Sequence, residues 1–156
     1  MIKKLIRIIG TTAFWLSWPL LYVYLQRAER TRVLLKAGDK VLLVQTWHGP
    51  GDWSLPGGGI HKNEEKTLAA TRELVEETTI TLGIEQLRPL GTKNHTEYGL
   101  VFTCHYFVGE FTRPLRAKAC FPEVLEVRWV SLDELSQYRL APDARYALSA
   151  SGTLLQ

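Results

Sequence analysis

The first pattern along the chain is a long apolar run. Residues 8–25 read IIGTTAFWLSWPLLYVYL, which is 18 residues without a charged side chain. A helix that spans a bilayer needs about 20 apolar residues, and Trp and Tyr favour the membrane interfaces. The run therefore predicts an N-terminal hydrophobic helix that anchors the chain in a membrane. An interfacial helix, a removed signal peptide and a helix packed on the domain remain open as alternatives.

After residue 30 the pattern becomes that of a layered domain. Short apolar runs alternate with turn residues and with one longer helical stretch. The elements we expect are strands over residues 33–36, 41–45, 100–108 and 124–130 and a helix over 62–78. The sequence AGD between the first two strands indicates a hairpin. Strands mixed with helices predict an α/β or α+β domain over residues 31–156, with 1–30 as a separate segment.

A second helix is expected to start at SLDEL, residues 131–135. Ser131 would cap its N-terminus, and Glu134 stands at the capping-box position three residues later. Beyond Ala141 the chain is only weakly patterned.

The charge of the chain is unevenly distributed. The net charge is +3. The first 30 residues hold five basic side chains against Glu29 alone, which leaves 14 basic and 15 acidic residues in 31–156. The domain therefore carries no charge signal for nucleic-acid binding. Cys104 and Cys120 lack metal-type spacing and are expected to be free thiols.

The candidate chemistry lies in a glutamate-rich helix that follows three glycines, LPGGG. Positions i, i+3 and i+4 share one helix face, so Glu73, Glu76 and Glu77 project together. Such clusters are usually solvated surface, but here no lysine follows any of the three at i+4. A hard divalent cation such as Mg²⁺ would relieve the repulsion, because it prefers oxygen ligands and bridges carboxylates to phosphates.

These residues resemble the Nudix box, G-x5-E-x7-R-E-U-x-E-E-x-G-U, where U is a bulky aliphatic residue. Gly58, Glu64 and the run RELVEETTI from Arg72 to Ile80 match eight of the nine specified positions. The exception is Thr79, which stands at the final glycine. The flanking phrases WSLPGGGI and EVRWVSLDEL are also typical of the family. The resemblance covers about residues 31–140.

The resemblance implies an α/β/α sandwich around a mixed sheet. It also implies hydrolysis of a diphosphate bond in a nucleoside diphosphate linked to another moiety, with Mg²⁺ or Mn²⁺ as the cofactor. Two alternatives stay open: an enzyme that acts on a non-nucleotide (sugar or isoprenoid) diphosphate, and a non-catalytic nucleotide-binding sensor. With the anchor, we expect membrane association with this domain in the cytoplasm, the alternative being a cytoplasmic protein.

By the same resemblance, functional roles are expected for residues in and near the box. The catalytic residues would be Glu73, Glu76 and Arg72. Arg72 would pair with Glu64 or Glu73. The metal ligands would be Glu73, Glu76, Glu77, the carbonyl of Gly57 and Glu123, with Glu126 and Glu97 as the alternatives to Glu123. Gly58, Gly59 and Glu64 would shape the box. Because a β-branched residue resists the left-handed conformation, we expect the helix to end differently at Thr79 than it would at glycine.

Overall fold

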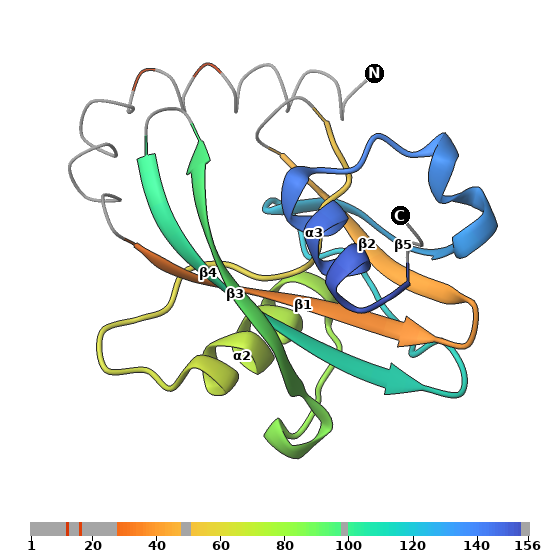
Figure 1. The fold of residues 1–156 in the computed structure, drawn as a ribbon, viewed down its shortest axis with the longest axis horizontal. Coiled ribbons are helices and arrows are strands. Elements are labelled where there is room, and N and C mark those ends of the chain that lie inside the picture. The colour runs from red at the N-terminus through yellow and green to blue at the C-terminus, as the bar shows by residue number, and fades with distance from the viewer. Residues whose placement is uncertain (1–11, 13–15, 17–27, 48–50, 98–99, 154–156) are drawn as a thin grey trace.

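The fold is a five-stranded mixed sheet with one helix on each face (Figure 1). This computed structural model describes residues 12, 16, 28–47, 51–97 and 100–153. The elements in chain order are β1 (Glu29–Ala37), β2 (Lys40–Thr46), α2 (Lys66–Thr78), the 3₁₀ helix η1 (Ile84–Gln86), β3 (Arg88–Glu97), β4 (Leu100–Phe111), β5 (Val124–Ser131), the 3₁₀ helix η2 (Leu132–Gln137) and α3 (Pro142–Ala150).

The strand order in the sheet is β3-β4-β1-β2-β5. The central strands β1 and β4 run parallel, whereas the other neighbours pair antiparallel. The hairpin predicted around AGD is confirmed as β1 and β2. The sheet is therefore mixed, as the predicted sandwich requires.

Alternating residues of the central strands build two separate cores. Val33 and Leu35 of β1 pack with Leu74 of α2 on one face. Leu34 faces the opposite way and joins Ala144 and Leu148 of α3. Successive side chains of a strand point to opposite faces, so each of these strands contributes to both layers. The predicted α/β/α sandwich is confirmed.

A short segment after β2, residues 54–59, lies against β1 and β2 and is called the glycine loop below. The amide of Thr31 donates to the Gly58 carbonyl at 2.8 Å, and that of Val33 donates to the Pro56 carbonyl at 2.9 Å. On the β2 side, Ser54 and Val44 exchange two backbone hydrogen bonds of 3.0 and 2.9 Å. These bonds fix the glycine loop to the centre of the sheet.

Helix α2 begins later than predicted and ends as a glycine-terminated helix would. Glu65 is its N-cap and accepts from the Leu68 amide at 2.8 Å, so the helix starts at Lys66 rather than at residue 62. At the other end, Thr79 has φ 62° and ψ 5° and donates its amide to the Val75 carbonyl. The expectation that Thr79 would end the helix differently is wrong, because this threonine adopts the left-handed conformation itself.

Other local expectations need correction too. The segment after Ser131 is the 3₁₀ helix η2, and the Ser131 side chain makes no capping bond. The sequence did not predict β3 or α3. The predicted strands at 100–108 and 124–130 correspond to β4 and β5, although β4 runs on to Phe111.

The predicted transmembrane anchor is not supported. Within residues 28–47, 51–97 and 100–153 and at positions 12 and 16, no helix is both long and apolar enough to cross a membrane. Nearly all of residues 8–25 lie outside the described residues.

Candidate active site at the glutamate helix

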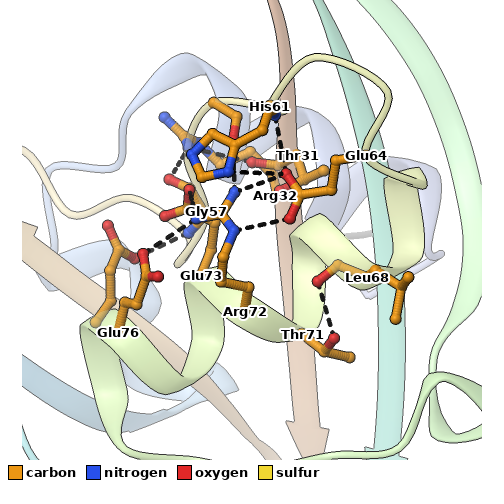
Figure 2. A network of polar contacts seen from close by, with 12 residues as sticks. Thr31, Arg32, Gly57, His61, Glu64, Leu68, Thr71, Arg72, Glu73 and Glu76 are labelled. Atoms are coloured by element: carbon orange, nitrogen blue, oxygen red, sulfur yellow. Dashed lines mark hydrogen bonds and ion pairs between the residues drawn. The ribbon is translucent and has the colours of Figure 1, made fainter.

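Arg72 is the hub of a polar network that joins α2 to the glycine loop (Figure 2). Its Nε and Nη2 donate to the two carboxylate oxygens of Glu64 at 2.8 and 3.0 Å, and Nη2 also reaches the Gly59 carbonyl at 2.9 Å. Its Nη1 donates to Glu73 at 2.7 Å and to Glu76 at 3.1 Å. The sequence predicted pairing with Glu64 or Glu73, and the structure shows both.

Glu64 is held in its charged form by this network. The hydrogen bond from Arg72 lowers the pKa of Glu64 to about 2, although partial burial opposes the shift. The amide of His61 adds a hydrogen bond of 2.8 Å to the same carboxylate. A bidentate guanidinium–carboxylate pair restricts both partners. Glu64 lies just before α2 and therefore holds the Arg72 side chain in place.

Glu73 is a buried carboxylate beneath the glycine loop, with only 7% of its surface exposed. A Cβ atom added to Gly58 would lie 2.6 Å from a Glu73 carboxylate oxygen. Only glycine lets the backbone approach the carboxylate this closely. Burial raises the pKa of Glu73, the Arg72 guanidinium lowers it, and the neighbouring charges of Glu76 and Glu123 raise it further.

Glu77 is buried more deeply, at 4% exposure, and contacts the loop backbone. The amide of Gly57 donates to its Oε2 at 2.9 Å. Burial raises the pKa of Glu77 to about 8, against the opposing effects of Arg32 and of the Gly57 amide. Gly57 itself has φ 138°, and a Cβ atom there would lie 2.3 Å from the Thr31 carbonyl oxygen. This position therefore requires glycine.

The apolar residues of α2 differ in their burial. Ala70 and Leu74 are buried, whereas Leu68 and Val75 are 50% and 42% exposed. The helix therefore turns two carboxylates, not these two apolar residues, toward the protein. Buried carboxylates are costly unless they are paired or bind a cation, so this orientation makes the carboxylate face the candidate functional site.

A second network, which the sequence did not predict, lies behind the glycine loop. The guanidinium of Arg32 donates to the carbonyl of Gly57, to the carbonyl of Thr31 at 3.2 Å and to Asp143 of α3 at 2.5 Å. The Ser54 hydroxyl donates to the same Asp143 oxygen at 2.7 Å. Burial alone would lower the pKa of Arg32, but the charge and hydrogen bond of Asp143, together with the nearby Cys104 and Glu77, raise it. The available sequence signal for this network was a charged residue, Arg32, directly before the apolar run of β1.

The predicted additional ligand, Glu123, lies just before β5 and is exposed. Its negative charge contributes to the raised pKa of both Glu73 and Glu77, which places it within electrostatic reach of the carboxylates. Of the alternatives, Glu126 accepts a hydrogen bond from Arg128. The side chain of Glu97 lies outside the part of the chain that the structure describes.

The carboxylates provide the donor atoms that a hard cation takes, although they do not form a closed shell. Among the described residues, no group of three His, Cys, Asp or Glu side chains stands ready to hold a metal ion. Arg72 binds Glu73 and Glu76, while the Gly57 amide binds Glu77. All the available donors are oxygens, and their mutual repulsion and burial favour a bound cation. The donor chemistry therefore fits a hard divalent cation.

Comparison with protein families gives a match over most of the chain. The family model described as the NUDIX domain matches residues 26–150. Among curated proteins, diphosphoinositol polyphosphate phosphohydrolase 2 of Rattus norvegicus is 45% identical over 42 residues, which is 27% of this chain and 24% of that protein. The chain spans less than half the length of the curated relatives it matches.

Solved structures confirm the same fold at low sequence identity. A MutT NUDIX hydrolase from Burkholderia pseudomallei is 24% identical with a TM-score of 0.71, covering 80% of this chain and 98% of that one. A bifunctional NMN adenylyltransferase/ADP ribose pyrophosphatase from Francisella tularensis, complexed with AMP and a manganese ion, is 22% identical with a TM-score of 0.72. The match covers 92% of this chain and 46% of that one.

Proposed function

The chain belongs to the Nudix family, and on this premise we propose that it hydrolyses a diphosphate bond with the help of a divalent metal ion. The substrate is a nucleoside diphosphate linked to another moiety, and residues 31–156 carry the activity. The observation that supports this most directly is the network in which Arg72 ties Glu64, Glu73, Glu76 and the Gly59 carbonyl together.

In the proposed site, Glu73, Glu76 and Glu77 hold the metal, with Glu123 and the Gly57 carbonyl as further oxygen donors. Arg32 already donates to that carbonyl. A carbonyl oxygen has two lone pairs, so one is left for a second partner. A bound divalent cation would neutralise charge on the phosphates and lower the pKa of the attacking water. Mg²⁺ is the proposed ion, and Mn²⁺ is a substitute with the same preference for oxygen.

The protein side chains position the site and accept a proton. Glu76 and Glu73 are the proposed acceptors for the proton of the attacking water. Glu76 is half exposed at the surface of the site, whereas Glu73 is buried beneath the glycine loop. Arg72 fixes the rotamers of both through its Nη1, so it acts as a positioning residue.

A second candidate substrate class is a non-nucleotide diphosphate. It is favoured by the curated proteins that match part of the chain, which are named diphosphoinositol polyphosphate phosphohydrolases. The carboxylates would have the same roles, because in the proposed site they act on the diphosphate and not on the attached moiety.

The test is phosphate-product release by the full chain across ADP-ribose, nucleotide sugars, dinucleoside polyphosphates, nucleoside triphosphates and a diphosphoinositol polyphosphate. Each substrate is assayed with Mg²⁺, with Mn²⁺ and with chelator. Glu76→Gln is the active-site variant. Glu85→Gln is the matched control, because it makes the same change on an exposed glutamate in η1.

We expect metal-dependent turnover of at least one substrate, lost in Glu76→Gln and kept in Glu85→Gln. A folded wild-type protein that turns over none of these substrates with either metal, yet binds a nucleotide, would favour the sensor alternative. Turnover that persists in chelator would contradict the metal mechanism.

A further inference from the structure

A row of cationic side chains crosses the sheet on the face that packs against α3. Arg30 of β1 is directly paired with Cys104 of β4, which in turn is paired with Lys93 of β3. Directly paired residues of neighbouring strands point to the same face of a sheet. Because Cys104 belongs to the α3-side core, Arg30 and Lys93 lie on that face too.

Aromatic rings support the two outer cations. The Arg30 guanidinium lies over the ring of Phe102, 4.9 Å from its centroid. The Lys93 ammonium lies 4.6 Å from the centroid of Tyr146 of α3. Stacking on a ring limits the positions of a flexible cation without neutralising its charge. The row is therefore a positioned set of charges and not two freely moving side chains.

Two further basic residues border this row. His95 stacks on Phe102 with ring centroids 5.5 Å apart, and its Nε2 lies 2.6 Å from the Tyr106 hydroxyl. Arg32 is two residues further along β1 than Arg30 and therefore points to the same face. The name "basic row" is used below for Arg30 and Lys93.

The carboxylate of Asp143, on this face, already accepts hydrogen bonds at both oxygens. One oxygen of Asp143 accepts from Arg32 at 2.5 Å and from Ser54 at 2.7 Å, while the other accepts from the Ala144 amide. Burial lowers the pKa of His95, and the charges of Lys93 and Arg32 lower it further, against the weaker effect of Asp143. The neighbouring charges therefore sum to a positive electrostatic potential at His95.

The basic row starts at the proposed site of phosphate chemistry. Arg30 is bridged to Gly59, whose carbonyl accepts from Arg72. Neighbouring strands lie about 4.8 Å apart, so Lys93, two strands from Arg30, is about 10 Å further from the glycine loop. A group bound there would belong to the moiety beyond the scissile diphosphate.

We propose that the basic row binds an anionic group, such as a phosphate, on the moiety beyond the scissile diphosphate. The protein then selects diphosphate substrates in which that moiety is phosphorylated over those in which it is neutral. This inference rests on the proposed function for the position of the diphosphate. Lysine and arginine form charge-assisted hydrogen bonds with phosphate, which are about twice as strong as neutral ones.

Binding to a polyanion without a diphosphate bond tests the row separately from catalysis. The probe is inositol hexakisphosphate, titrated calorimetrically into the full chain in chelator. Lys93→Gln and Arg30→Gln each remove one charge from the row. Lys40→Gln is the matched control, because it removes the same charge at the β1–β2 turn, at the opposite end of β1. Melting curves verify that each variant is folded.

We expect each variant of the row to weaken the affinity about tenfold and Lys40→Gln to leave it unchanged. Lys93 is exposed on the edge strand β3, so its substitution leaves the core intact. Undetectable binding by the wild type, or equal affinity in all four proteins, would overturn the proposal. If Arg30→Gln unfolds, the comparison of Lys93→Gln with Lys40→Gln decides alone.

A kinetic comparison places the row relative to the diphosphate. Coenzyme A and dephospho-coenzyme A differ by one phosphate that lies away from the diphosphate bond. We expect the wild type to have the higher kcat/KM for coenzyme A, and Lys93→Gln to bring the ratio toward one. Hydrolysis of both at equal kcat/KM would overturn the selectivity and leave the proposed hydrolase intact, whereas hydrolysis of neither, with polyanion binding retained, would count against the proposed function alone.

Discussion

Replacing Thr79 by glycine should stabilise the protein, because this threonine ends α2 in a conformation that suits glycine. Thr79 has φ 62° and an exposed side chain, so the substitution removes strain without removing a core contact. The left-handed conformation costs a residue with a Cβ atom roughly 1–2 kcal/mol. Glycine in turn loses roughly 0.5–1 kcal/mol more backbone entropy on folding. The net gain expected for Thr79→Gly is about 1 kcal/mol.

The assay is thermal unfolding of the full chain in chelator, monitored by circular dichroism. For a protein of this size, about 1 kcal/mol raises Tm by roughly 2–4 °C. Thr81→Gly is the matched control, since Thr81 is also exposed but is not among the residues with positive φ. Thr81→Gly incurs only the cost in backbone entropy and should lower Tm. Equal decreases for Thr79→Gly and Thr81→Gly would refute the assignment of strain to position 79.

Three further predictions concern the site. Gly57→Ala should cost about 3 kcal/mol or more of stability, because its Cβ atom would overlap the β1 backbone, whereas Gly59→Ala, in open space, should be nearly neutral in the same melts. Arg72→Lys should lower kcat about 10–100-fold in steady-state assays with Mg²⁺, while Arg113→Lys, in the exposed loop after β4, should not; equal kcat for both would refute a positioning role. Burial raises the pKa of Glu77 from 4.5 to about 8, so the metal-free folded protein retains a proton that the unfolded chain releases. The contribution of Glu77 to stability should be full below pH 4.5 and should be lost between pH 4.5 and 8 in chelator, and Glu77→Gln should flatten this part of the Tm–pH curve.

The parts of the fold that local patterns encode could be predicted from the sequence. The β1–β2 hairpin has apolar runs around a turn, and α2 has a helical spacing and a specific motif. Strand β3 was missed because RPLGTKNHTE is polar and contains Pro and Gly, which an edge strand tolerates. Helix α3 was missed because nine residues with a proline at the start give little periodicity.

The site was predictable where its residues are close in the sequence. The contacts of Arg72 with Glu64 and Glu73 lie within one motif. The pair Arg32–Asp143 joins residues 111 positions apart, one of them on the unexpected α3. The Thr79 conformation was mispredicted because tertiary packing overrides local preference. Thr78 and Ile80 are both buried, so the chain between them has to follow the path that the core sets.

The attachment of the glycine loop to β1 gives the central strand two amides with an unusual role. Thr31 and Val33 donate to Gly58 and Pro56 instead of to a neighbouring strand. Deuterium exchange at these two amides therefore requires separation of the glycine loop from β1 and not unfolding of the sheet. Their exchange rates measure the free energy of loop opening, and substrate or metal that closes the loop would slow both amides together.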